Sequence, residues 1–304
     1  MKILFCTDGS DTSFAAAEKS LSFLKKDNRL DILYVLDKEY PAKILNKSKL
    51  AGQKSIIYKN YSRSILEKAA QYLENKGYTV TNMLDLEGNP ADKIIQFVKT
   101  GNYDLCILGS HGKSGITSWL GSVSRKVIAN SSIPVLVVRP KDSVNNVKYK
   151  KSKNILVAID GSDTSYFAIH KMIELLNIKD DDIEIIDVVD SSETIPSKLV
   201  LDDEWLDTYM KMQRASANEV LDKAMDIFKQ NNIQPKSAFI VEGNPAKEIL
   251  DYSKENRIDL TVIGSKGHGE IANLLMGSVS RRILDNIGGV VLVVPKKNFE
   301  ASAT

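Results

Sequence analysis

Two glycine-rich segments of this chain have the residue types and the spacing of an anion-binding loop. One begins Gly109-Ser-His-Gly and continues to Gly121-Ser-Val-Ser, and the other begins Gly264-Ser-Lys-Gly and continues to Gly277-Ser-Val-Ser. Each follows a short apolar run that is typical of a buried strand. Glycines let backbone N–H groups approach an anion with no Cβ in the way, and the serines begin a helix whose first N–H groups lack intrahelical partners. The combination predicts phosphate binding in each half of the chain.

Each part of this pattern also has a plain structural explanation. A tight turn accounts for Gly-x-x-Gly, and Ser-Val-Ser can cap a helix. The fixed spacing, present twice, favours anion binding. The P-loop pattern is excluded because it requires glycine where Ile107 stands. The dinucleotide fingerprint is excluded too, because the first strand is followed by Asp-Gly-Ser.

An acidic residue follows the first apolar run of each half. Asp8 and Asp160 each begin the sequence Asp-Gly-Ser-Asp-Thr-Ser, and the next apolar runs include Val35 and Val188 near their ends. In an open parallel sheet, ligands bind beyond the carboxyl ends of the strands, where the strand order reverses. A carboxylate there can hold a ribose hydroxyl or a metal ion on phosphates, and the backbone after the second strand could recognise a base.

The chain is a tandem duplication. Glu87-Gly-Asn-Pro-Ala matches Glu242-Gly-Asn-Pro-Ala, and the valine-rich run at Pro134 matches the one at Val290. The period is far too long for a solenoid, and 304 residues suffice for two domains. We predict a first domain over 1–140, a linker over 141–153, a second domain over 154–297 and a tail over 298–304.

Strands and helices are expected to alternate within each copy. Asn89 and Asn244 can cap helices that begin with proline, and Gly77 can stop a helix. The first helix of each copy has an apolar stripe: Phe14, Ala17, Leu21 and Leu24, and then Tyr166, Ile169, Ile173 and Leu176. Five strands and four helices per copy predict an α/β fold with two tandem doubly wound, Rossmann-like domains, each a mainly parallel five-stranded sheet.

Composition argues against several classes of protein. Hydrophobic residues make up 43% and charged residues 26%, as in ordinary globular proteins. The net charge of +2, from 41 basic and 39 acidic residues, gives no footprint for nucleic acid or an anionic membrane. We interpret the basic segment Lys148–Lys153 as a solvated linker. No run of residues reaches the roughly 18 apolar positions of a membrane span.

The reactive side chains do not suggest catalysis. Cys6 and Cys106 lie in apolar runs and are expected to be inert core thiols, which fits a reducing cytoplasm. The first residues enter a strand at once, without a signal-peptide pattern. His111, His170 and His268 occupy non-equivalent positions, and neither metal-site spacing nor a nucleophile elbow is present. We therefore predict no catalytic residues and no metal site.

These motifs resemble those of the universal stress proteins, in their tandem-domain form. The resemblance rests on the Asp-Gly-Ser loops, the Glu-Gly-Asn-Pro elements and the late glycine motif, and it covers nearly the whole chain. It implies the adenine nucleotide alpha-hydrolase-like variety of the Rossmann-like fold. In the nucleotide-binding branch of that family the motif is Gly-x2-Gly-x9-Gly-Ser/Thr. The second repeat matches it in full, whereas the first has eight residues between Gly112 and Gly121.

The resemblance implies a set of nucleotide contacts in each repeat. In the second repeat they are Asp160, Val188, Gly264, Ser265, Gly267, Gly277, Ser278, Val279 and Ser280. Their counterparts in the first are Asp8, Val35, Gly109, Gly112, Gly121, Ser122 and Ser124. The implied ligand is ATP or a related adenine nucleotide, with which Mg²⁺ could bind. Family members commonly dimerise through the last strand, so the two halves are expected to pair these edges as an intramolecular pseudo-dimer, and a homodimer stays open.

Three functions are compatible with the sequence. The first is a non-enzymatic, nucleotide-binding regulatory module of the stress response. The second is a slow ATPase or phosphotransferase that uses the same pocket, although no residue is evidently placed to activate water against a γ-phosphate. The third is a scaffold that binds no nucleotide. We expect the first, and the sequence does not identify a protein partner.

Overall fold

The computed structural model describes residues 1–37, 54–110, 120–139, 152–190, 203–268 and 276–296. The chain divides into two compact units that correspond to the two repeats. Most of the predicted linker and the whole predicted tail lie outside the described residues, so these boundaries stay predictions. The predicted pairing of the two halves also stays a prediction.

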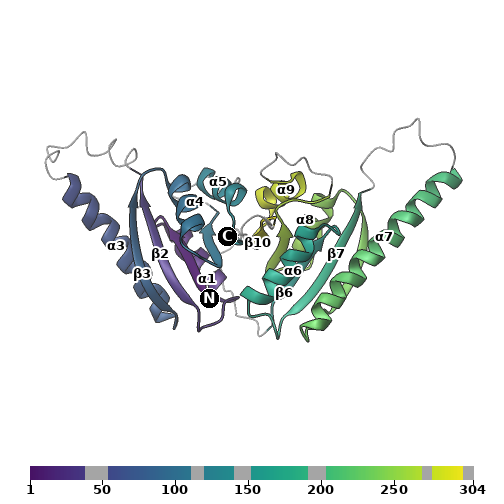
Figure 1. Cartoon of the computed structure of the whole chain (residues 1–304), viewed down its shortest axis with the longest axis horizontal. Coiled ribbons are helices and arrows are strands. Elements are labelled where there is room, and N and C mark those ends of the chain that lie inside the picture. The colour runs from purple at the N-terminus through teal and green to yellow at the C-terminus, as the bar shows by residue number, and fades with distance from the viewer. Residues whose placement is uncertain (38–53, 111–119, 140–151, 191–202, 269–275, 297–304) are drawn as a thin grey trace, which may run out of the picture. The chain divides into compact units, whose positions relative to one another are not determined.

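Strands and helices alternate in both repeats, as the sequence predicts (Figure 1). The first repeat consists of β1 (Lys2–Thr7), α1 (Asp11–Leu21), β2 (Arg29–Leu36), α3 (Lys54–Asn75), β3 (Thr79–Glu87), α4 (Pro90–Thr100), β4 (Leu105–Gly109), α5 (Ser122–Asn130) and β5 (Val135–Arg139). The second consists of β6 (Asn154–Ile159), α6 (Asp163–Leu175), β7 (Asp182–Asp190), α7 (Asp203–Gln230), β8 (Ser237–Gly243), α8 (Pro245–Glu255), β9 (Leu260–Gly264), α9 (Ser278–Asn286) and β10 (Gly289–Val294).

The two repeats have the same strand order. It is β3-β2-β1-β4-β5 in the first and β8-β7-β6-β9-β10 in the second. Neighbouring strands within each repeat are parallel. In both, the strand order reverses at the first strand, so that β1 lies between β2 and β4, and β6 lies between β7 and β9. The predicted doubly wound α/β fold is confirmed.

The central strands are buried on both faces. β1, β4, β6 and β9 are almost continuously buried along their lengths, because helices lie on both sides of the strands of each repeat (Figure 1). The predicted stripe of the first helix is confirmed at Phe14, Ala17 and Leu21, which are buried, whereas Leu24 is buried but lies beyond the end of α1. In α6 the stripe is wrong at one position, because Met172 is fully buried and Ile173 is only half-buried.

Several predicted ends of helices are also found. The side chains of Asn89 and Asn244 accept hydrogen bonds from backbone N–H groups, of Asp92 and Lys247 respectively, each at 3.2 Å. Ser10 caps α1 in the same way through the N–H of Ser13. Side-chain caps of this kind satisfy N–H groups that the helix itself leaves without partners.

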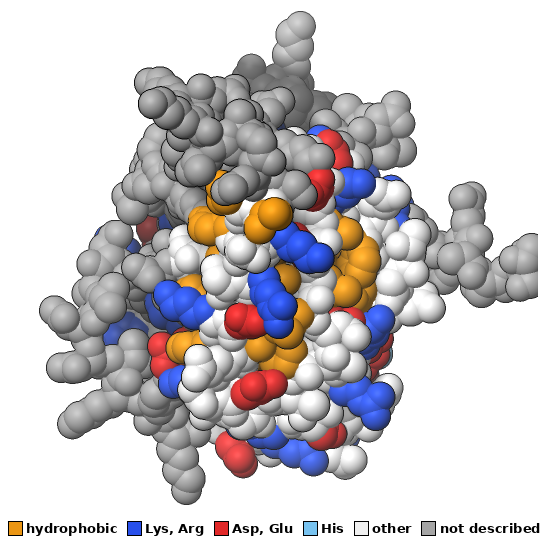
Figure 2. Space-filling view, turned by 90° about the vertical axis from the view of Figure 1, so that its left-hand side faces the viewer, with side chains coloured by type: hydrophobic (Ala, Val, Ile, Leu, Met, Phe, Trp, Pro, Cys, Tyr) orange, Lys and Arg blue, Asp and Glu red, His pale blue; other side chains and the backbone are white. Residues whose placement is uncertain are grey.

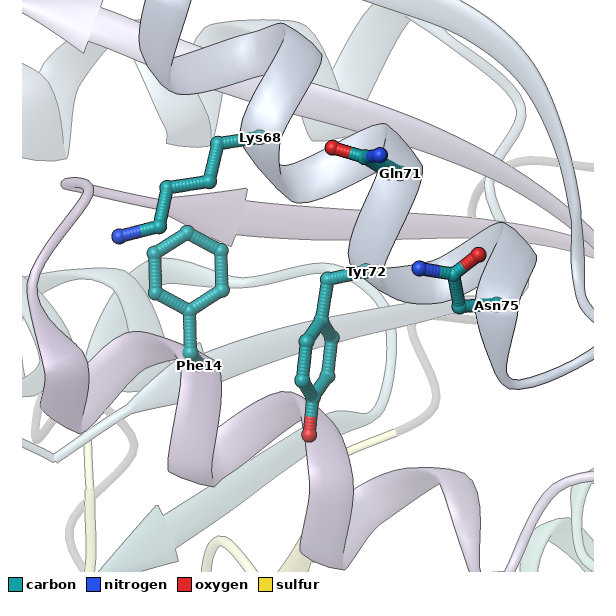
Figure 3. A pocket seen from close by; sticks show the side chains of 5 residues that line it. All are labelled: Phe14, Lys68, Gln71, Tyr72 and Asn75. Carbon is teal, nitrogen blue, oxygen red and sulfur yellow. The ribbon is translucent and has the colours of Figure 1, made fainter.

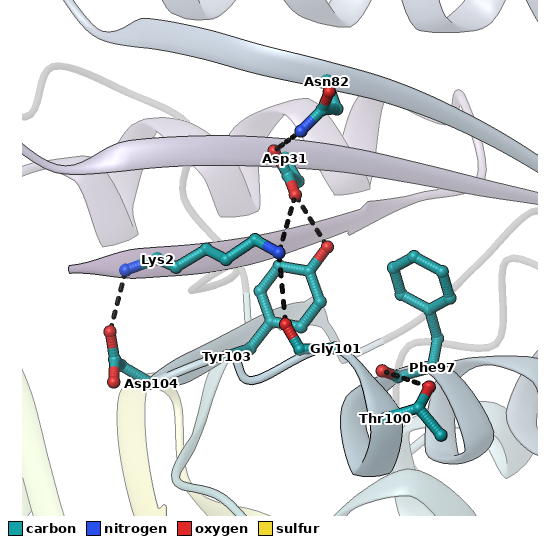
Figure 4. Close-up of polar contacts among 8 residues, drawn as sticks. All are labelled: Lys2, Asp31, Asn82, Phe97, Thr100, Gly101, Tyr103 and Asp104. Carbon is teal, nitrogen blue, oxygen red and sulfur yellow. Dashed lines mark hydrogen bonds and ion pairs between the residues drawn. The ribbon is translucent and has the colours of Figure 1, made fainter.

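A buried polar cluster braces the amino ends of the strands of the first repeat (Figure 4). Asp31, only 2% exposed, accepts hydrogen bonds from the hydroxyl of Tyr103 at 2.7 Å and the side-chain amide of Asn82 at 2.8 Å. The ammonium group of Lys2 lies 3.6 Å from the same carboxylate. These partners compensate the cost of burying the charge. The cluster lies at the opposite end of the strands from Asp8, so its role is structural.

Candidate functional site

The candidate site of the second repeat lies where the strand order reverses. The segment Asp160-Gly-Ser follows β6, and the glycine turn that begins at Gly264 follows the adjacent strand β9. The carboxyl ends of two parallel strands whose connections go in opposite directions form a crevice between those connections. The topology therefore brings the two predicted motifs to the same place.

The Asp-Gly-Ser loop holds its carboxylate in a defined orientation. Gly161 has a φ of +78°, which a residue with a Cβ adopts only with strain. The backbone N–H of Ser162 donates to Oδ1 of Asp160 at 3.0 Å, and the Ser162 hydroxyl donates to the same oxygen at 2.6 Å. Ser162 also caps α6 through the N–H of Ser165. The loop thus presents an exposed carboxylate beside a helix start.

The glycine turn packs directly against that loop. The backbone N–H of His268 donates to Oδ2 of Asp160 at 3.0 Å. A Cβ built on Gly267 would overlap this same oxygen. A Cβ on Gly264 would lie 3.0 Å from Cγ2 of Thr164, in the first turn of α6. At both glycines, a side chain would therefore crowd the Asp160 loop or the first turn of α6.

The third part of the site is the start of α9. The N–H of Gly277 donates to the carbonyl of Ser265 at 2.8 Å, and the Ser280 hydroxyl donates to the carbonyl of Gly264 at 2.7 Å. These bonds tie the helix start to the end of β9. Because the buried hydroxyl of Ser280 is used in this way, we expect it to contribute a backbone N–H to a ligand rather than its hydroxyl.

The start of α9 has no side-chain cap. Gly277 occupies the N-cap position without a side-chain hydrogen bond, and Gly121 does the same for α5. Among the helices whose starts are described, α1, α4, α6 and α8 are all capped by serine or asparagine. A glycine at the N-cap places no side chain over the first N–H groups from that position, and the positive end of the helix dipole attracts an anion.

The first repeat has the same framework as far as it is described. Asp8 accepts hydrogen bonds from the N–H and hydroxyl of Ser10, at 3.0 and 2.6 Å. The N–H of Gly121 donates to the carbonyl of Ser110, and the buried Ser124 donates its hydroxyl to the carbonyl of Gly109. Gly112 and most of the shortened eight-residue spacer lie outside the described residues, so the geometry of this turn stays a prediction.

The remaining predicted residues occupy the expected elements. Val188 and Val35 lie near the carboxyl ends of β7 and β2, the strands beside β6 and β1. The exposed serines Ser278 and Ser122 begin α9 and α5, and Val279 follows in the first turn. Hydrogen bonds and close packing thus connect five of the predicted residues of the second repeat, namely Asp160, Gly264, Gly267, Gly277 and Ser280. Val188 and Val35 are near these sites because their strands lie next to β6 and β1.

Asp187, a buried carboxyl in β7 next to Val188, is not among the site residues predicted from the sequence. It is 7% exposed and lies opposite Ile159, the residue before Asp160. Burial, and then the negative charge of Asp160, raise the pKa of Asp187 to about 6. Its signal was an acidic residue inside an otherwise apolar run, Ile185-Ile-Asp-Val-Val. The first repeat has Tyr34 at this position, so the two sites differ in charge.

The described residues contain no cluster of three or more histidine, cysteine, aspartate or glutamate side chains that could hold a metal ion. Within the same residues, no helix is long and apolar enough to cross a membrane. On the face seen in Figure 2, basic and acidic side chains are interspersed with small hydrophobic groups. Among the described side chains seen there, the positive charges are not gathered into one patch.

A separate hollow of about 350 Å³ lies between α1 and α3 (Figure 3). It is lined by Phe14, Lys68, Gln71, Tyr72 and Asn75. The rings of Phe14 and Tyr72 are 5.8 Å apart, and the Lys68 ammonium lies 5.0 Å from the centre of the Phe14 ring. None of these residues belongs to the predicted site, so we assign the hollow to the packing of the two helices.

Comparison with known proteins identifies the family. The model of the universal stress protein family matches residues 1–139 and 151–295. Universal stress protein Slr1230 of Synechocystis is 23% identical over 93% of this chain and 95% of its own length. Universal stress protein MJ0531 of Methanocaldococcus jannaschii is 34% identical over 45% of this chain and 81% of its own. The crystal structure of a universal stress protein from Archaeoglobus fulgidus has the same fold, with a TM-score of 0.63 and 22% identity over 97% of this chain and 96% of that one. Because the family model matches both repeats, the chain belongs to the universal stress protein family.

Proposed function

We propose that this chain binds an adenine nucleotide, ATP or AMP, in its second repeat and acts in the stress response by binding rather than by catalysis. One observation carries the proposal most directly. The start of α9, which has glycine at its N-cap, is hydrogen-bonded to the end of β9, and the glycine turn that follows β9 is hydrogen-bonded to the oriented carboxylate of Asp160. Such a helix start attracts phosphate, and the carboxylate can accept hydrogen bonds from a ribose diol.

Each part of the nucleotide has a suitable place in this arrangement. The phosphates would lie against the turn at Gly264–Gly267 and the N–H groups at the start of α9. The ribose would reach Asp160, and the backbone near Val188 would contact the base. A magnesium ion would be bound mainly by the phosphates themselves, since the described residues contain no cluster of metal-binding side chains.

We expect little or no turnover of the bound nucleotide. Hydrolysis requires a group that positions water against the γ-phosphate. The exposed Asp160 is already hydrogen-bonded to Ser162 and to His268, and Asp187 is buried. Phosphate release with ATP and Mg²⁺ tests this expectation. Release within the usual enzymatic range of about 1–1000 per second, lost in Asp160→Ala, would identify a nucleotidase instead.

Mass spectrometry of the ligands that freshly purified protein releases on denaturation tests the binding proposal. We expect an adenine nucleotide in the parent protein and much less of it in Gly277→Val. Protein that carries no nucleotide, and takes none up when ATP or AMP is added, would support a nucleotide-free scaffold. We further propose a cytoplasmic location, because the two buried thiols are not paired in a disulfide.

A further inference from the structure

The contacts of Asp160 point to a second role for this residue. Both of its carboxylate oxygens are engaged in the structure. Oδ1 accepts the N–H and the hydroxyl of Ser162, and Oδ2 accepts the N–H of His268 at 3.0 Å. The bonds of Oδ1 are local and orient the side chain. The bond of Oδ2 joins segments that are 108 residues apart in the chain, and so it fixes the glycine turn to the end of β6.

Gly267 supports this interpretation independently. Apart from its neighbours in the chain, the described atoms nearest to a Cβ at this position would be Oδ2 and Cγ of Asp160. The backbone of Gly267 does not have the positive φ that favours glycine. Among the described residues, the close contact that a Cβ would make at this position therefore comes from the carboxylate of Asp160.

We propose that Asp160 is a positioning residue that holds the turn Gly264–His268 against the end of β6 through this hydrogen bond, the Asp160–His268 clasp, and that a bound nucleotide displaces the His268 N–H from Oδ2. The second clause rests on the proposed function, whereas the first does not. A ribose hydroxyl that donates to Oδ2 would replace the backbone donor. Binding of the ribose at Asp160 would then break the hydrogen bond that holds His268, while the phosphates would contact the other end of the turn, near Gly264.

If the clasp exists, the effect of Gly267→Ala on the thermal midpoint should depend on whether Asp160 is present. In the parent protein, Gly267→Ala forces a methyl group against the carboxylate and should lower the thermal midpoint. In an Asp160→Ala background the obstructing atoms are gone, so the same substitution should have almost no effect. Gly264→Ala is the matched control, because its methyl group would meet Thr164 and the backbone of Lys266. Its cost should be the same in both backgrounds. Equal costs of Gly267→Ala in both backgrounds would overturn the clasp.

Amide hydrogen exchange measures the clasp itself in the protein without nucleotide. We expect the His268 amide to exchange at least about tenfold faster in Asp160→Ala than in the parent, since a hydrogen bond to a carboxylate is lost. Unchanged exchange would contradict the proposal. ATP and AMP should then speed exchange at His268 and slow it at Ser278–Ser280, a pattern that a merely structural contact would not produce.

The two proposals can fail separately. Nucleotide that protects the start of α9 while His268 stays protected would overturn the displacement step and leave nucleotide binding intact. If no nucleotide binds, the proposed function and the displacement step both fail. The measurements without ligand still decide whether Asp160 holds the turn.

Discussion

Residues of the glycine motif in the second repeat can pack within the site itself or contact a ligand. The sequence pattern does not distinguish these two roles. Gly267 was expected to let an anion approach the backbone, but in the structure the space beside it is filled by the carboxylate of Asp160. Ser280 was expected to contact a ligand, but its hydroxyl is bonded to the backbone of Gly264. The motif therefore specifies the internal construction of the site as well as ligand contacts.

The protonation of Asp187 makes the stability of the folded protein depend on pH. Its pKa is raised from 3.8 to about 6 on folding, so the folded state retains a proton that the unfolded state loses in this range. The stabilisation by the protonated carboxyl is complete below pH 3.8 and is lost as the pH rises through about 6. We expect Asp187→Asn to exceed the parent in stability by about 1–3 kcal/mol at pH 8, and to match it near pH 4.

Urea unfolding at both pH values checks this expectation. Asp190→Asn is the control, because Asp190 is exposed at the end of the same strand. A stability difference for Asp187→Asn that is the same at both pH values would show that its charge is not disfavoured in the fold.

The two cysteines should be unreactive in the native protein. Their sulfur atoms lie 3.9 Å apart in the core, and burial, together with the neighbouring Cys106 thiol, raises the pKa of Cys6 well above its usual range. Because the thiolate is the reactive form, a maleimide should label neither until the protein unfolds. Ser216→Cys, at an exposed position of α7, should be labelled at once. Labelling of native Cys6 at the rate of this control would contradict the account.

At the scale of elements, the order of strands and helices could be predicted because each has a local signal. Caps at Asn89 and Asn244, the apolar stripe of α1 and the valine-rich last strands depend on residues close together in the sequence. The error at Ile173 arose because Met172 and Ile173 are both apolar, so the pattern alone does not decide which one turns inward. Asp187 was missed because the apolar run around it predicts a buried strand equally well with or without a charge.

The clasp between Asp160 and His268 had no signal in the sequence. It depends on the path of the turn after β9 relative to the loop after β6, and these segments meet only in the folded sheet. The order of strands and the late glycine motif predicted that the two segments would converge. They did not predict which atoms would touch.

The cluster at the amino ends of the strands gives a prediction for these elements. Tyr103→Phe removes a hydroxyl donor from the buried Asp31 and should cost about 1–3 kcal/mol of stability. Tyr252→Phe is the matched change in the second repeat, where the hydroxyl donates to Glu184 at 3.1 Å in a less buried setting. We expect a smaller loss there. Urea unfolding of both variants at pH 7 tests the ranking, and an equal or reversed order would contradict it.

In the molecule as a whole, the duplication produces two candidate sites with similar backbone arrangements but different residues and loop lengths. Both repeats have the oriented aspartate and the uncapped helix start. Only the second repeat has nine residues between its Gly-x-x-Gly turn and its Gly-Ser helix start. It also has Asp187 where the first repeat has Tyr34. We therefore expect the two sites to have diverged, with the second as the principal nucleotide site.

Titration calorimetry with ATP on the parent, Gly277→Val and Gly121→Val tests whether the second repeat holds the principal nucleotide site. The backbone at both glycines has a negative φ, −71° and −59°, that valine can adopt. Neither substitution therefore strains the backbone, and each side chain should obstruct the N–H groups at one helix start. We expect Gly277→Val to weaken binding at least about tenfold, which is about 1.4 kcal/mol, and Gly121→Val to change it little. Equal losses in the two variants, or a larger loss in Gly121→Val, would contradict the assignment of the site to the second repeat.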